Sequence, residues 1–322
     1  KIPAGYPRNR LGLAQWLFHP DHPLFTRVTV NRFWQEIFGR GLVRTPEDFG
    51  SQGELPTHPE LLDWLSVWFR NSGWDVKALH KLMVMSATYR QSSVTTPELV
   101  QKDPDNRLYS RSQAGRLSAE QTRDNALASS GLLMREIGGP GVYPYQPDGI
   151  WEALATRNAV NYVQSHGDSL YRRSMYTYWK RSAPPPMMLN FDAAERHFCS
   201  VKRQKTSTPL QALVTLNDPQ FVEAARVLAQ KAMENAGETP DAVLNYFFKS
   251  LASRPPRDRE LEILRNLYRQ EEQEFRGNLQ KCRQLLSVGE KPVNDKLPPH
   301  QLAAYTVVAS TLMNFDEVLI KR

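Results

Sequence analysis

Residues 207–230 read STPLQALVTLNDPQFVEAARVLAQ, and two helix starts follow one another in this stretch. Thr208 precedes Pro209 and Asp218 precedes Pro219, which is the order of an N-cap residue and a proline in the first helical position. The helix predicted after Pro219 has an apolar face at helical spacing, formed by Val222, Ala225, Leu228, Ala229 and Ala232. This part of the chain is therefore expected to be helical.

Further helix starts of the same kind are predicted toward the carboxyl end. Thr239 followed by Pro240 predicts another helix start. Residues 261–286 predict one long amphipathic helix, with its apolar side marked by Leu264, Leu267, Tyr268 and Phe275. A last helix is expected after Pro298 and Pro299.

Helix signals also fill the amino-terminal third of the chain. Residues 24–38 carry apolar side chains close to helical spacing, and glycines follow them. Thr57 with Glu60 predicts a capping box that opens the first helix of a helical hairpin. Ser118 with Gln121 predicts a second capping box further on.

The middle of the chain differs, because glycines and prolines from Gly138 onward interrupt any period. The alternating aromatic pattern of residues 170–182 predicts one or two strands. We therefore expect a mainly α fold, with two helical lobes around an irregular middle segment that contains a few short β-strands. The predicted organisation is one compact domain, 1–322, made of a helical lobe (1–137), an irregular basic segment (138–205) and a second helical lobe (206–322).

Composition excludes several classes of protein. The 322 residues are 40% hydrophobic and 23% charged, which is unlike a disordered or fibrous chain. No apolar run reaches the roughly 18 residues of a membrane span. Two cysteines, Cys199 and Cys282, exclude a disulfide framework and a cysteine-built metal centre. The chain begins at Lys1 without a signal peptide, so we expect a piece of a longer or processed polypeptide.

The positive charge is concentrated. The chain has 41 Lys and Arg against 34 Asp and Glu, a net charge of +7. Residues 172–205 contain eight basic and two acidic side chains and so hold most of the excess. Such a stretch attracts phosphate, sulfate, carboxylate or an acidic protein face, although it is equally consistent with a solvated surface.

Several candidate catalytic side chains lie beside this basic stretch. Asp192, Glu195 and His197 could perform acid–base chemistry on an anionic substrate, and Cys199 could be a thiol activated by His197. The alternative is an ordinary surface segment. His19 and His22 are interpreted as a surface turn instead of a metal site, and neither a nucleotide-binding nor a hydrolase motif is found. We expect no metal and no cofactor, and the chain has no C-x-x-C-H haem motif of its own.

A second hypothesis places an anion or a partner at the start of the helix that follows Thr208. Arginines near a helix amino terminus make a competent anion site. The competing interpretation is that Gln211 and Asn217 only satisfy buried backbone groups. The predicted anion- or partner-binding residues are Arg172, Arg173, Arg196, Lys202, Arg203, Lys205, Thr208 and Gln211.

Several phrases of the sequence resemble a known family over nearly the whole chain and in the same order. They are VNRFW (30–34), FGRGLV (38–43), PEDFG (46–50), HPELLDWL (58–65), SATYRQSS (86–93), DPDNRL (103–108), STPLQAL (207–213), LNDP (216–219) and LMNFDEVL (312–319). The chain resembles planctomycete-specific domain one, a carboxy-terminal domain of unknown function. The chain departs from that family at His22 and at residues 196–199, which weakens a metal role for His22 and a family-wide catalytic role for His197 or Cys199.

The resemblance implies a cellular location and neighbouring domains, but it implies no enzymatic activity. Relatives are exported and carry a haem-bearing, cytochrome-c-like region upstream, so it implies an exported location and those upstream domains as partners. The leading hypothesis is a non-catalytic interaction or scaffold module with a basic surface for an acidic glycan or a partner domain. The first alternative is an enzyme, or an enzyme-completing domain, that acts on anionic polysaccharide through Asp192, Glu195 and Arg203. The last is single-stranded nucleic-acid binding, for which no reading motif is found.

Overall fold

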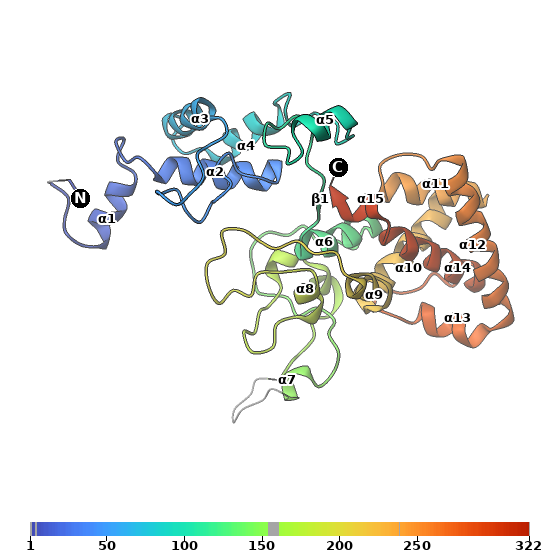
Figure 1. Ribbon diagram of the computed structural model, residues 1–322. Coiled ribbons are helices and arrows are strands. Elements are labelled where there is room, and N and C mark those ends of the chain that lie inside the picture. Colours follow the sequence, from blue (N-terminus) through green and yellow to red (C-terminus); the bar gives the residue numbers. More distant parts are fainter. Residues whose placement is uncertain (1, 4, 154–160, 238, 322) are drawn as a thin grey trace. The chain divides into compact units, whose positions relative to one another are not determined.

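The computed structural model describes residues 2–3, 5–153, 161–237 and 239–321, and it divides the chain into two compact units. Unit 1 runs from Lys1 to Gly115 and unit 2 from Arg116 to Lys321. Most of the secondary structure in both units is helical, which confirms the expected mainly α fold (Figure 1). Among the described residues, no helix is long and apolar enough to cross a membrane.

Unit 1 is built on a helical hairpin against a further helix. Its helices are α1 (Arg10–Leu17), α2 (Phe25–Phe38), α3 (Pro59–Asn71), α4 (Val76–Val84) and α5 (Pro97–Lys102). Helix α2 packs on α3 and α4 around Val30, Leu65 and Leu79, which are nearly fully buried. The predicted capping box at Thr57 is wrong: His58 is the N-cap of α3, and the Thr57 hydroxyl instead donates to the Leu42 carbonyl.

Unit 2 contains the remaining elements, and its two ends pair with each other. These elements are β1 (Gly115–Arg116, which begins on the last residue of unit 1), α6 (Ala119–Ser130), α7 (Ile150–Ala153), η1 (Gly167–Tyr171), η2 (Ser174–Tyr176), α8 (Pro186–Asn190), α9 (Pro209–Asn217), α10 (Pro219–Asn235), α11 (Pro240–Leu251), α12 (Asp258–Gly277), α13 (Leu279–Leu286), α14 (Pro299–Met313), α15 (Asp316–Leu319) and β2 (Ile320–Lys321). Strands β1 and β2 form a two-stranded sheet. Helix α6 therefore belongs with the middle segment and the carboxy-terminal helices.

The core of unit 2 surrounds α10, which packs on α6 and α14, while α12 covers the other side of α14 (Figure 1). The predicted apolar face of α10 is buried, with Leu228 and Ala229 at 0% exposure. Asp218 caps α10 through its side chain, as predicted. The long helix predicted for residues 261–286 is divided at Asn278, which ends α12 and caps α13.

The predicted strands in residues 170–182 are wrong. This segment forms the short 3₁₀ helices η1 and η2, and its ladder contacts are isolated bridges such as Val142 with Thr177. The alternating aromatics reflect a different arrangement, in which Tyr178 stacks on Tyr143 with ring centroids 4.7 Å apart. A buried arginine of α6, Arg123, fixes the segment by donating hydrogen bonds to its backbone.

Candidate functional site

Arg172, one of the predicted anion-binding residues, is buried and engaged by the protein itself. Its guanidinium donates to the backbone carbonyls of Gly138 and Pro140 and lies 4.2 Å from the centre of the Tyr176 ring. Only 5% of Arg172 is exposed. This side chain therefore holds the glycine-rich loop, and its charge does not face solvent.

Two further cations of the basic segment lie against aromatic rings. The Lys180 ammonium lies 4.3 Å from the centre of the Trp151 ring, and the Arg196 guanidinium lies 4.7 Å from that of Trp179. Such contacts contribute about 0.5–1 kcal/mol at exposed sites. The indole of Trp179 also donates to the Glu195 carbonyl over 3.0 Å. Of the other predicted residues, Arg173 is half-buried and Lys202 is exposed.

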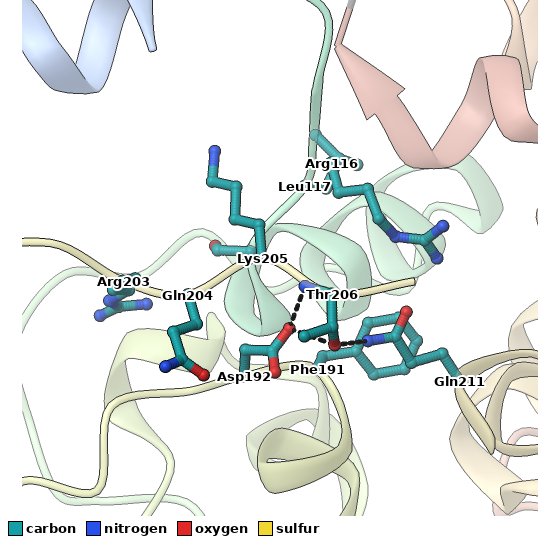
Figure 2. A pocket seen from close by; sticks show the side chains of 10 residues that line it. Arg116, Leu117, Phe191, Asp192, Arg203, Gln204, Lys205, Thr206 and Gln211 are labelled. Carbon is teal, nitrogen blue, oxygen red and sulfur yellow. Dashed lines mark hydrogen bonds between the residues drawn. The ribbon is translucent and has the colours of Figure 1, made fainter. Parts of the chain in front are cut away.

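The remaining part of the basic segment lines a pocket in unit 2 (Figure 2). Four separate pieces of chain form it: the end of β1 with the cap of α6, the residues that follow α8, the segment before α9, and the first turn of α9. The lining residues are Arg116, Leu117, Ser118, Phe191, Asp192, Arg203, Gln204, Lys205, Thr206 and Gln211.

A short chain of hydrogen bonds organises the pocket. Asp192 has a left-handed backbone (φ 57°), and its Oδ2 accepts from the Thr206 amide at 2.7 Å and from the Thr206 hydroxyl at 2.8 Å. That hydroxyl in turn accepts a bond of 3.3 Å from Nε2 of Gln211. The dashed lines in Figure 2 mark these bonds. Asp192 therefore ties the segment before α9 to the end of α8.

Gln211 belongs to the pocket wall, although only 2% of it is exposed. Its Nε2 donates to the Asn190 carbonyl over 2.9 Å, and this fixes the orientation of the amide because a carbonyl oxygen can only accept. The other amide atom, Oε1, is buried and has no hydrogen-bond partner in the described part of the chain. The pocket wall thus contains a buried hydrogen-bond acceptor that receives no hydrogen bond from the described residues.

The three cations of the pocket differ in their partners. Arg203 donates to Glu120 of α6 over 2.8 Å. Burial raises the pKa of Glu120, but the hydrogen bond and charge of Arg203 outweigh that effect and bring it below its ordinary value. The Arg116 guanidinium donates to the neutral Ser207 hydroxyl over 2.8 Å, and Lys205 is exposed. Within the residues described, neither Arg116 nor Lys205 has an acidic partner.

The helix that follows the pocket begins as predicted, with one difference. Thr208 is the N-cap of α9 and Pro209 occupies its first turn, but the Thr208 side chain makes no capping bond. Its hydroxyl is exposed beside the pocket-lining segment. The amino end of α9 and two cations without an acidic partner therefore occur in one part of unit 2.

The structure does not gather the candidate catalytic residues. Asp192 lines the pocket, whereas Glu195 and His197 are exposed on the segment that follows it and are not among the lining residues. Cys199 is free and exposed, and Cys282 is free and buried. The proposed acid–base group thus has one member in the pocket.

No cluster of three or more potential metal ligands occurs among the residues that the structure describes. The two histidines of the amino-terminal loop cap turns instead. His19 Nδ1 accepts from the Asp21 amide at 3.1 Å, and His22 Nδ1 accepts from the Phe25 amide at 3.0 Å.

Sequence reasoning selected Asp192, Arg203, Lys205 and Gln211 but missed other members of the pocket. Arg116 is far away in sequence, and the hydrogen bonds that join this region to the segment before α9 are those from Arg116 to Ser207 and from Arg203 to Glu120. Thr206 carried a weak signal, since it lies in the polar run before Pro209. The missed lining residues are Arg116, Leu117, Ser118, Phe191, Gln204 and Thr206.

Comparison with known proteins gives one finding. A family model described as PSD1, protein of unknown function (DUF1553), matches residues 9–268. No curated protein matches the chain, and no solved structure does.

Proposed function

The chain belongs to the PSD1 family of proteins of unknown function, and from that premise we propose that it is a non-catalytic binding domain whose basic surface around the pocket binds an acidic glycan. The observation that carries the proposal is the charge of the pocket. Arg203 is matched by Glu120, and the Asp192 carboxylate accepts hydrogen bonds from Thr206 but keeps its negative charge, so three cations face two carboxylates and one positive charge is in excess. Arg116 and Lys205 remain for a ligand, and both are donors suited to carboxylate or sulfate.

Neutral polar groups beside these cations support a sugar over a simple ion. Gln204 is exposed on the pocket lining and offers both an amide donor and an acceptor. Thr208 adds an exposed hydroxyl next to the same segment. Sugar hydroxyls both donate and accept, so an acidic sugar matches this mixture of cations and neutral groups.

Location and partners form the second part of the proposal. The sequence resemblance supports an exported protein in which this domain works beside a haem-bearing upstream region. Fractionation of the native host tests the location, and a protein recovered with the cytoplasmic fraction contradicts it. Co-purification of the upstream region with the 322-residue chain tests the partnership.

Binding of polygalacturonate to the 322-residue chain, followed by isothermal titration calorimetry over a salt series, tests the glycan proposal. We expect an affinity that falls as salt rises, because exposed charges are screened. Neutral dextran should not bind. Lys205→Glu combined with Arg116→Glu should weaken polygalacturonate binding roughly a hundredfold or more, since each charge-assisted contact contributes about 1.5–3 kcal/mol.

Lys249→Glu is the matched control, because Lys249 is exposed on α11 and is not among the residues that line the pocket. It changes the net charge without changing the pocket. Equal weakening by Lys249→Glu and Lys205→Glu would show that only net charge matters and would contradict a specific pocket. Absence of binding to polygalacturonate, chondroitin sulfate and alginate alike would refute the acidic-glycan proposal.

A further inference from the structure

One buried polar atom of the pocket wall has no partner in the described part of the chain, and it is a hydrogen-bond acceptor. Gln211 is 2% exposed, and its Oε1 receives no hydrogen bond from the described residues. The amide does not turn over to pair this atom, because its Nε2 donates to the Asn190 carbonyl and a turned amide would place two oxygens against each other. A buried acceptor of this kind costs free energy until a ligand or a water supplies the donor.

The unpaired oxygen lies where α9 begins. Gln211 is the third residue of this 9-residue helix, and the side chain of the N-cap residue, Thr208, makes no capping bond. Figure 2 shows the Gln211 amide nitrogen directed at Thr206 and the amide oxygen directed away from it, toward the side of the pocket on which Arg116 lies. The cavity has a volume of about 20 Å³, which is room for one group the size of a water molecule or a hydroxyl. The pocket therefore suits one small donor group.

The charge of the surroundings selects a neutral donor. An ammonium group could donate to Gln211, but the three cations of the pocket outnumber the two carboxylates beside them and repel it. A hydroxyl donates without adding positive charge, and it has the size that the cavity admits. A carboxylate on the same molecule can then meet Arg116 and Lys205, which have no acidic partner among the residues described. A uronic acid combines a hydroxyl and a carboxylate on one small ring.

Access to the oxygen depends on the segment before α9. Residues 202–208 are exposed and belong to no helix or strand, and the Thr206 hydroxyl of this segment contacts Gln211. The segment is held by side-chain hydrogen bonds, which join Arg203 to Glu120, Thr206 to Asp192 and Ser207 to Arg116. Exposed segments held in this way open locally at low cost. A ligand hydroxyl therefore reaches the oxygen when the segment moves aside, and α9 stays folded.

We propose that Gln211 Oε1 determines the specificity of the site by accepting a hydrogen bond from a ring hydroxyl of a uronic acid whose carboxylate is held by Arg116 and Lys205. The inference rests on the proposed function, because it names the sugar class among the acidic glycans that the basic surface binds. An anion without a hydroxyl donor leaves the buried acceptor unpaired, and the site discriminates against it for that reason. The hydroxyls of the glycan set the affinity together with its charge.

Methyl galacturonoside and the three analogues in which fluorine replaces one of its ring hydroxyls test this contact on the unaltered chain. Fluorine has nearly the size of a hydroxyl and leaves the carboxylate in place, but it donates no hydrogen bond. Competition with bound polygalacturonate, followed by isothermal titration calorimetry, measures the affinity of each compound. We expect one analogue to compete at least about tenfold less well than the parent compound, because it leaves the Gln211 oxygen unpaired.

Gln211→Met shows whether that discrimination comes from Gln211. Methionine keeps the length of the side chain and removes the amide oxygen, so the parent compound and the analogue should compete equally well in this variant. Gln270→Met, at an exposed glutamine of α12, is the matched control and should keep the tenfold difference. Circular dichroism shows whether each variant is folded. Hydrogen–deuterium exchange of the unaltered chain gives a second measurement, in which the parent compound should slow the amides of residues 202–211 more than the weaker analogue does.

The outcomes separate this inference from the proposed function. Equal competition by the parent compound and all three analogues overturns the inference and leaves the acidic-glycan proposal in place. A tenfold difference that persists in Gln211→Met also overturns it, since the donor is then recognised elsewhere. Failure of polygalacturonate, chondroitin sulfate and alginate to bind overturns both. If chondroitin sulfate binds and polygalacturonate does not, methyl glucuronoside and its fluorine analogues are the probes.

Discussion

Replacing Arg123 by methionine removes a buried cation that joins three parts of unit 2. Arg123 is 2% exposed and donates from α6 to the carbonyls of Leu170 and Arg172, at 2.9 and 2.8 Å. It also donates to the Ser174 hydroxyl at 3.2 Å and to the side chain of Gln220 in α10. Methionine keeps the apolar stem and removes every one of these donors.

The expected loss follows from the acceptors left behind. A buried acceptor without a donor costs about 1–3 kcal/mol, and removal of one partner from a buried charged network costs about 3–5 kcal/mol. Burial lowers the pKa of Arg123 to about 10, and the carboxylates of Asp124 and Asp218 oppose that effect, so the guanidinium stays charged at neutral pH. We therefore expect Arg123→Met to destabilise unit 2 by about 3–5 kcal/mol.

Hydrogen–deuterium exchange is the suitable assay, because the chain has two compact units and a single unfolding curve would mix them. Amides of α6 and α10 should exchange faster in Arg123→Met than in the unaltered protein. The ratio of the two exchange rates should correspond to the 3–5 kcal/mol by which the free energy of unfolding of unit 2 falls. Arg135→Met, at an exposed arginine, is the control and should change the stability by less than about 0.5 kcal/mol. A loss below about 1 kcal/mol in Arg123→Met would refute the reasoning, since it would mean that the acceptors find other donors.

Three other predictions concern unit 2. Gly289→Ala should cost roughly 2–4 kcal/mol, because Gly289 has φ 89° and an added Cβ would lie 2.2 Å from the Glu223 carboxyl carbon; unchanged hydrogen exchange of the α10 amides would contradict this. Asn278→Ala should cost about 1 kcal/mol by removing the cap of α13, which hydrogen exchange of the α13 amides measures. Hydrogen bonds from Arg254 lower the pKa of Glu260 to about 2 from an ordinary 4.5, so their stabilisation is present above pH 4.5 and is lost as the pH falls through about 2. Arg254→Gln should flatten that part of the stability profile, and an identical profile would count against the pair.

Local signals predicted the helices well where a cap and a proline act within a few residues. The starts of α9, α10 and α11 follow from such pairs. The Thr57 capping box failed because a tertiary contact, the bond from Thr57 to the Leu42 carbonyl, uses the hydroxyl that would have capped α3. The strands predicted near Tyr178 failed because aromatic alternation also arises when rings stack on one another outside a sheet.

The candidate site was predictable only in its local part. Lys205 and Gln211 could be selected because they flank one helix start. Arg116 could not, since its place beside the pocket depends on contacts between distant parts of the sequence, such as its hydrogen bond to Ser207. Arg172 shows the converse: its charge suggested an exposed cation, but the carbonyls of the glycine-rich loop bury it. The sequence shows that a residue is charged, whereas the fold shows which carboxylates, carbonyls or aromatic rings contact that charge.

The pairing of β1 with β2 also has a consequence for protein engineering. Neighbouring strands lie about 4.8 Å apart, so the chain enters and leaves unit 2 at almost the same point. A segment with adjacent ends can be inserted into a surface loop of a host protein without stretching that loop, and its own ends can be joined by a short linker. Unit 2 therefore has the geometry required for insertion into a host protein. It is also suited to circular permutation, in which the original ends are joined by a linker and new termini are made at an exposed loop.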